Sequence, residues 1–167
     1  MPRFVFVFAR AFACLFFLTC FSLAHADVFG EGDRVMVEVG PYVYHRIDNT
    51  EHNQWPRLIG VEYETASNWL LGATSFRNSY YQDAALLYGG KRWFVTPVSE
   101  NLYVKVAAGL VYGYKDPYSD KLPINSHNGY GLAILPAVGY QFGRANVQLV
   151  FLGTTAAAIT FGYDFWK

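Results

Sequence analysis

Residues 102–113 read L-Y-V-K-V-A-A-G-L-V-Y-G, a stretch in which side-chain character changes at every second position. Val104 and Val106 fall on one parity, whereas Tyr103 and Lys105 fall on the other. A period of two places successive side chains on opposite faces of an extended chain, so this stretch predicts a β-strand with two distinct faces.

The same alternation recurs along the chain in segments separated by polar turns. Eight strands are predicted, at residues 33–45, 57–64, 69–78, 82–93, 102–114, 130–142, 146–152 and 156–166. The connections alternate between short polar ones (65–68, 96–101, 143–145) and longer or more irregular ones (46–55, 79–81, 115–129, 153–155). Short turns at one end and longer loops at the other are typical of bacterial outer-membrane barrels.

The prediction is therefore an all-β protein, an eight-stranded antiparallel transmembrane β-barrel. Within hydrocarbon every backbone polar group needs a partner, and a sheet satisfies this only by closing on itself. Eight strands are too few for an aqueous channel, which excludes a general porin. A soluble periplasmic sandwich or lipocalin-like barrel is the alternative, because alternation alone does not say which face meets lipid.

The N-terminal region has the layout of a secretory signal peptide. Arg3 and Arg10 supply positive charge, residues 11–23 are apolar, and Ala24-His25-Ala26 offers small residues before a cleavage point. We expect a cleaved signal peptide at 1–26, a barrel at 27–167, and export to the outer membrane of a Gram-negative bacterium. Both cysteines lie in the predicted signal peptide.

Composition narrows the function classes. Lys plus Arg and Asp plus Glu are 13 each, so the formal net charge is zero, which argues against nucleic-acid binding. Charged residues make up 16%, against about 25% in ordinary soluble domains, while hydrophobic residues reach 53% and aromatic residues 19%. These proportions exclude disorder and favour the membrane. We expect no metal site and no cofactor, and a monomer in the outer-membrane bilayer.

If Val104 and Val106 face lipid, the residues of the opposite parity face the interior of the barrel. Small and aliphatic side chains would face inward at Ala107, Gly109, Val111, Ala133, Leu135, Ala137, Gly139, Val150 and Leu152. Polar side chains gather toward the short-turn end, at Glu62, Glu64, Lys105, Gln141 and Asp164. We interpret this as a pocket for a hydrocarbon chain above a polar plug. Close packing in a narrow barrel is the alternative.

The sequence resembles a known family in three co-linear stretches, residues 71–93, 97–111 and 132–155. The best anchors are Phe76-Arg77-Asn78-Ser79, Tyr88-Gly89 and Ile134-Leu135-Pro136-Ala137-Val138-Gly139-Tyr140. They are similar to segments of the PagP family of outer-membrane lipid A palmitoyltransferases. The resemblance implies an enzyme that moves palmitate from the sn-1 position of a phospholipid donor to a lipid A acceptor.

The resemblance also implies catalytic residues at the outward-facing end of the barrel. Ser79 matches the serine of the family's Asp-Ser pair, and Asn78 stands at the aspartate, where an amide cannot supply negative charge. Asp83 is a candidate to compensate. His45 is the expected catalytic histidine, because it ends the first predicted strand at the long-loop side, with His52 and His127 as rivals. Both an acyl-enzyme and direct transfer remain open.

Further roles follow from the same resemblance. Gly89 matches the family's pocket-floor glycine and is expected to face inward together with Ala85, with Ala107, Gly109 and Leu135 as further pocket residues. Because Gly90 follows directly, the sequence leaves open which of the two glycines faces inward. Pro56 and Pro136 match prolines that mark lateral gates, because proline cannot donate to a strand ladder.

Two other functions stay open at this point. One is a lipid A 3-O-deacylase, a barrel hydrolase that uses a His-x-Ser pair on a late strand; here Ser126-His127 is reversed and lies in a loop. The other is a structural or adhesin-like small barrel without catalysis.

Overall fold

The structure, a computed structural model, describes residues 29–47, 52–122, 124–125 and 128–166. The predicted signal peptide at 1–26 and the Ser126-His127 pair lie outside these residues. No helix in the described part of the chain is long and apolar enough to cross a membrane.

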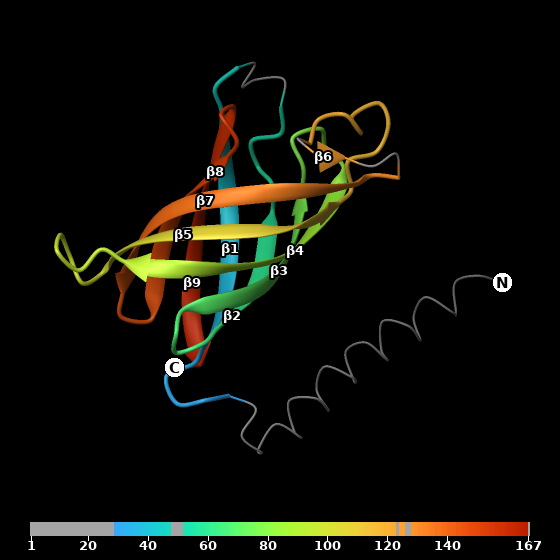
Figure 1. Ribbon diagram of the computed structural model, residues 1–167. Helices are drawn as coiled ribbons and strands as arrows, with labels where there is room; N and C mark the ends of the chain where they lie inside the picture. The colour runs from blue at the N-terminus through green and yellow to red at the C-terminus, as the bar shows by residue number, and fades with distance from the viewer. Residues whose placement is uncertain (1–28, 48–51, 123, 126–127, 167) are drawn as a thin grey trace. The chain divides into compact units, whose positions relative to one another are not determined.

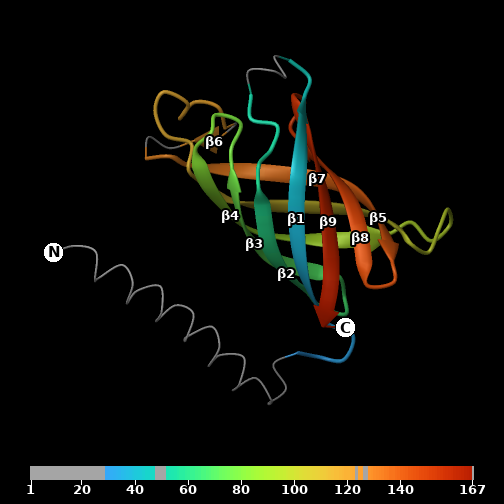
Figure 2. The ribbon, with the colours of Figure 1, turned by 180° about the vertical axis from the view of Figure 1, so that it is seen from behind.

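The described chain forms a closed antiparallel barrel of eight strands (Figures 1 and 2). They are β1 (Arg34–His45), β2 (Leu58–Glu64), β3 (Trp69–Arg77), β4 (Asp83–Phe94), β5 (Leu102–Tyr112), β7 (Tyr130–Phe142), β8 (Ala145–Leu152) and β9 (Ala156–Trp166). Sequence neighbours pair with each other, β1 pairs with β9, and β5 pairs with β7. The eight predicted strands and their order are confirmed.

One short strand was not predicted. Strand β6 (Ile124–Asn125) lies in the connection between β5 and β7 and pairs with Leu132 and Gly131 of β7. The turns at 65–68, 95–101 and 143–144 lie at one end of the barrel, and the longer connections lie at the other, the upper end in Figure 1. We call this upper end the mouth.

The outward face of the barrel is apolar. Exposed side chains on its strands include Val37, Val39, Ile59, Val61, Leu71, Leu87, Val104, Val106, Leu132, Ile134, Leu149, Phe151, Ile159 and Phe161. Exposed aromatic residues flank this band: Tyr44, Trp55, Tyr81 and Tyr130 toward the mouth, and Trp69, Trp93, Phe142, Tyr163 and Trp166 toward the short turns. An apolar band between aromatic girdles is the surface of a membrane-spanning barrel. The alternative with an apolar interior and a polar exterior is wrong.

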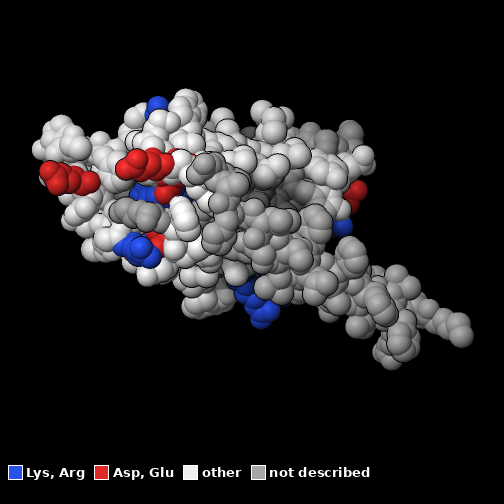
Figure 3. All heavy atoms as spheres, turned by 90° about the horizontal axis from the view of Figure 1, so that it is seen from below, with Lys and Arg blue, Asp and Glu red and all other residues white. Residues whose placement is uncertain are grey.

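A network of buried polar side chains fills the short-turn half of the barrel. The Arg92 guanidinium lies 2.6 Å from Glu64 and 3.5 Å from Glu62, and the Lys105 ammonium lies 3.0 Å from Glu62. Arg34 pairs with Glu64. On the surface seen from below, basic and acidic atoms also lie close together on one part of the barrel (Figure 3). The predicted polar plug is therefore present.

Apolar side chains occupy the interior above this network. Leu70, Leu86, Tyr88, Ala107 and Val111 form a buried cluster. Packed against it are Phe76, Tyr114, Leu122, Ala133 and Leu135. The Tyr88 hydroxyl donates to Glu62 at 2.8 Å and to Glu38 at 3.2 Å, so this ring lies at the boundary between the apolar and polar halves.

Candidate active site

A histidine and a serine meet at the mouth of the barrel. His45 is the last residue of β1 and is 6% exposed, and Ser79 lies two residues after the end of β3. The His45 Nε2 and Ser79 Oγ atoms are 2.8 Å apart, a hydrogen-bond distance. A hydroxyl beside an imidazole is the arrangement in which the ring can take the hydroxyl proton. The structure thus brings together the two residues expected from the sequence.

Asn78 does not point at this pair. Its Oδ1 accepts hydrogen bonds from the backbone N–H groups of Tyr80 and Gln82, at 2.9 and 3.0 Å. Its Nδ2 donates to the carbonyl of Gly113 at 3.2 Å, and the side chain is 2% exposed. This is the bonding of a turn-forming asparagine, which organises the β3–β4 connection that carries Ser79. Asp83 is exposed at the start of β4.

Two neighbouring residues of the loop between β1 and β2 reach the His–Ser pair. The His52 ring stacks on His45 with centroids 4.9 Å apart and meets the Tyr80 ring edge-on at 5.3 Å. Asn53 is buried, and its backbone N–H donates to the carbonyl of Ser79 at 2.9 Å.

The Asn53 side chain fixes the same segment from a second direction. Its Nδ2 donates to the carbonyls of Arg77 and Asn78, both at 3.1 Å, so Asn53 engages three successive carbonyls around the serine. The sequence analysis considered His52 only as a rival to His45 and missed Asn53, since no periodic signal marks a loop residue. His127 lies outside the described residues.

Tyrosines complete the mouth. Tyr80 stacks on Tyr118 with centroids 4.1 Å apart and meets Tyr114 edge-on at 6.4 Å. Burial raises the pKa of Tyr114 to about 12. Burial also raises the pKa of Tyr80, with Asp120 and Tyr118 acting in the same direction and Lys121 against it. Both phenols therefore stay neutral at ordinary pH, whereas burial and the neighbouring His52 lower the pKa of His45 and favour its neutral, proton-accepting form.

Two of the expected pocket residues face the wrong way. Tyr88 and Arg92 of β4 point into the barrel, so by the period of two Ala85 and Gly89 point outward. The expectation that Gly89 forms the pocket floor, with Ala85 on the same inner face, is therefore wrong. The inward glycine is Gly90.

Gly90 has a structural reason to lack a side chain. A Cβ there would lie 2.2 Å from the carbonyl oxygen of Val106, so β5 approaches β4 too closely for any larger residue. At Gly89 the nearest atom would be 3.5 Å away, which is ordinary contact. Ala107, Gly109 and Leu135 lie on the inward parity, as expected from the sequence. Their role in binding an acyl chain stays a prediction.

Both predicted gate prolines stand where a strand ladder stops. The β7–β8 ladder ends at the pair Ala137 and Val150, immediately before Pro136. Pro56 precedes β2, and the β1–β2 ladder ends at the pair Gly40 and Leu58. Missing ladder bonds at these points agree with the absence of an N–H on proline. Passage of a lipid through either gap stays a prediction.

Comparisons with known proteins add the following. No protein-family model and no curated protein matches the chain. Among solved structures, a chain described as "De novo design of transmembrane beta-barrels" is 18% identical, with 78% of this chain and 94% of that chain covered and a TM-score of 0.49. Likeness at this level assigns neither a family nor an activity. Among the described residues, no group of three or more His, Cys, Asp or Glu side chains is placed to hold a metal ion.

Proposed function

We propose that this protein is an outer-membrane acyltransferase that moves a palmitoyl chain from the sn-1 position of a glycerophospholipid to lipid A. The observation that carries the proposal is the 2.8 Å contact between His45 Nε2 and Ser79 Oγ at the mouth. In an outer-membrane barrel the longer loops face the cell exterior, the side on which lipid A lies. The protein acts as a monomer in this proposal.

The chemistry follows from the pair. Ser79 Oγ attacks the ester carbonyl of the donor while His45 Nε2 takes the hydroxyl proton, and the developing oxyanion collapses to release the lysophospholipid alkoxide, which recovers that proton. A lipid A hydroxyl then attacks the acyl-serine in the same way and restores Ser79. In the direct route His45 instead takes the proton of the lipid A hydroxyl, and the Ser79 O–H stabilises the oxyanion.

The interior supports the choice of a lipid substrate. The apolar cluster below the mouth contains Leu86 and Ala107, with Leu135 packed against it, and these side chains would surround the tail of a donor. Each buried methylene contributes about 0.8 kcal/mol, so a long tail contributes much of the binding free energy. Phe76, Tyr114 and Leu122 pack against the same cluster, so the tail has to displace side chains as it enters.

Mass spectrometry of lipid A tests the proposal, in a strain that lacks other lipid A-modifying acyltransferases and deacylases. Expression of the chain should add one palmitoyl unit, and Ser79→Ala or His45→Ala should abolish the addition. Slower migration after boiling than before, on gels, verifies that each variant is a folded barrel. Loss of a hydroxyacyl chain would instead show the deacylase, and unchanged lipid A with a folded barrel would show a structural or adhesin-like protein.

A further inference from the structure

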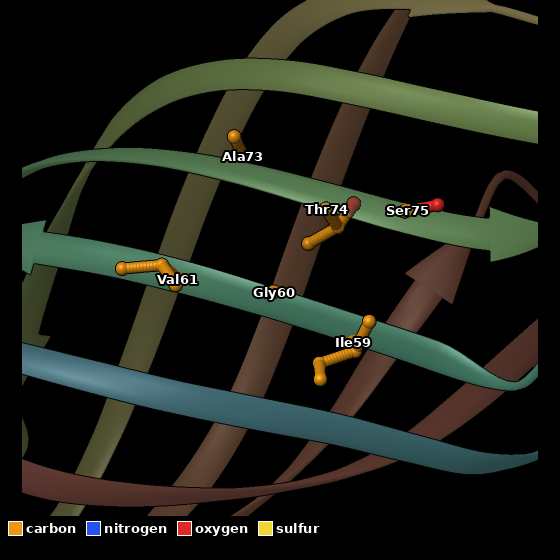
Figure 4. A pocket seen from close by; sticks show the side chains of 6 residues that line it. All are labelled: Ile59, Gly60, Val61, Ala73, Thr74 and Ser75. Atoms are coloured by element: carbon orange, nitrogen blue, oxygen red, sulfur yellow. The ribbon is translucent and has the colours of Figure 1, made fainter. Parts of the chain in front are cut away.

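A groove lies on the lipid-facing side of the barrel, across β2 and β3 (Figure 4). Its volume is about 320 Å³, and its lining is mainly apolar: Ile59, Gly60, Val61, Ala73, Thr74 and Ser75.

The groove results from unequal side chains on paired strands. Ile59 is the partner of Ser75, and Val61 is the partner of Ala73. The β2 members are branched and stand out from the barrel, whereas the β3 members are small. Branched residues therefore form one wall, and the small side chains of β3 leave the space beside it.

Two arginines lie at the upper end of this groove. Arg57 immediately precedes β2, Arg77 ends β3, and both are exposed. A hydrogen bond of 2.6 Å from the Arg77 N–H to the Pro56 carbonyl joins the two backbones at this level, one step above Ile59 and Ser75. Arg57 and Arg77 therefore lie next to each other at the mouth end of the groove.

The surroundings leave this end positively charged. Arg77 Nε donates to the carbonyl of Tyr81 at 2.9 Å, and its guanidinium lies 5.9 Å from the Tyr81 ring centroid. Asp83 is the cross-strand partner of Arg77 and the acidic residue at this level, yet no ion pair joins the two in the described part of the chain. Among the described residues at this level, Arg57 and Arg77 thus supply two positive charges and Asp83 one negative charge.

We propose that this groove is the docking site of lipid A, with an acyl chain along β2 and β3 and a phosphate between Arg57 and Arg77. Guanidinium groups match phosphate oxygens with two parallel hydrogen bonds, which suits arginine to this contact. Arg77 is two residues from Ser79, so the docked lipid stands beside the His–Ser pair. The proposal rests on the proposed function in one respect, that the bound lipid is the acyl acceptor.

Lipid binding to the purified full-length barrel in detergent tests the site without any transfer reaction. Native mass spectrometry compares bisphosphorylated lipid A, the same lipid A after removal of its phosphates, and phosphatidylglycerol. The wild type should prefer the bisphosphorylated form by at least about tenfold, as expected for charge-assisted hydrogen bonds. Equal binding of the first two lipids, or stronger binding of phosphatidylglycerol, overturns the assignment to lipid A.

Variants locate the site. Arg57→Asn with Arg77→Gln should abolish the phosphate preference; asparagine is chosen because Arg57 has a φ of 50°, which asparagine tolerates. Asp83→Asn should strengthen binding, and Arg144→Gln, an exposed arginine at the other end, should change nothing. Ala73→Leu with Ser75→Leu should weaken binding of both lipid A forms equally, because the added side chains fill the groove.

Each remaining outcome counts for or against the site. If the double arginine variant fails to form a barrel, Arg57→Asn alone and Asp83→Asn must still shift the phosphate preference in opposite directions. A phosphate preference that is unchanged by the loss of Arg57 overturns the proposal. Phosphate-dependent binding by a wild type that transfers no acyl chain would leave the docking site intact and refute the proposed function instead.

Discussion

Replacing Arg92 by methionine should destabilise the barrel strongly. Arg92 is 1% exposed and bonds to Glu64, Glu62 and Gln141, the last at 3.2 Å. Removing one partner of a buried ion pair costs about 3–5 kcal/mol, mostly because the other charge stays buried. In this variant Glu62 still pairs with Lys105, and Glu64 still pairs with Arg34. We therefore expect a loss of unfolding free energy at the lower end of this range, about 3 kcal/mol.

The assay is equilibrium unfolding in urea of the refolded barrel, followed by tryptophan fluorescence and by gel mobility. Arg92→Met with Glu64→Gln should recover at least half of the loss, because it removes one of the two carboxylates that lost the Arg92 guanidinium, while Arg34 keeps Asp164 at 3.7 Å. Arg144→Met, at an exposed arginine, should stay within about 0.5 kcal/mol of the wild type. A loss below about 1 kcal/mol for the single variant, or a double variant less stable than the single, would refute the account of the network.

Three further predictions concern the mouth and the strands. Asn53→Asp should lower the rate of acyl transfer at least about tenfold, since a carboxylate would face the carbonyls of Arg77 and Asn78, whereas Asn101→Asp at the short-turn end should not; initial rates in detergent decide. Burial and the nearby His52 lower the pKa of His45, which must be unprotonated to accept a proton, so the transfer rate should fall only at a pH below the ordinary histidine value of about 6.5; a profile that stays flat down to about pH 4 would contradict this role. Gly90→Ala should destabilise the barrel by about 1–3 kcal/mol through overpacking, whereas Gly89→Met should leave both stability and acyl-chain selectivity unchanged, as unfolding and lipid A mass can show.

Strand positions and the inward face were predictable because they depend on a local period. Lys105 and Glu62 alternate with apolar side chains on β5 and β2, so both were placed inside the barrel once the apolar parity was assigned to lipid. Closure follows from the requirement that no strand edge remain open in lipid. These features need no knowledge of contacts between distant residues.

The prediction of which β4 residues point into the barrel was wrong at a pair of glycines. Neither Gly89 nor Gly90 carries a side chain that marks a face, so the resemblance decided, and it placed Gly89 inside. The hydrogen bonds from Tyr88 to buried carboxylates settle the register the other way. Placing the Tyr88 phenol inside the barrel would have given the correct face.

The contacts around Ser79 were beyond sequence reasoning for another reason. Asn53 and Ser79 lie on different connections, and the bonds between them depend on how two irregular segments fold over the mouth. The role of Asn78 in the turn could have been predicted from the sequence, since asparagine after a strand commonly bonds to backbone N–H groups two residues ahead.

The distribution of polar contacts has a mechanical consequence. The polar network in the short-turn half receives side chains from seven strands: β1, β2, β4, β5, β7, β8 and β9. It includes hydrogen bonds from Gln141 to Asp164 at 3.1 Å and from Gln148 to Thr160 at 3.3 Å. Directional bonds of this kind resist shear between neighbouring strands, whereas the apolar packing above allows side chains to slide. The two ends of the barrel therefore differ in compliance. Under the proposed function, a lipid that enters at the mouth would deform the rim, while the circumference of the base would stay constant.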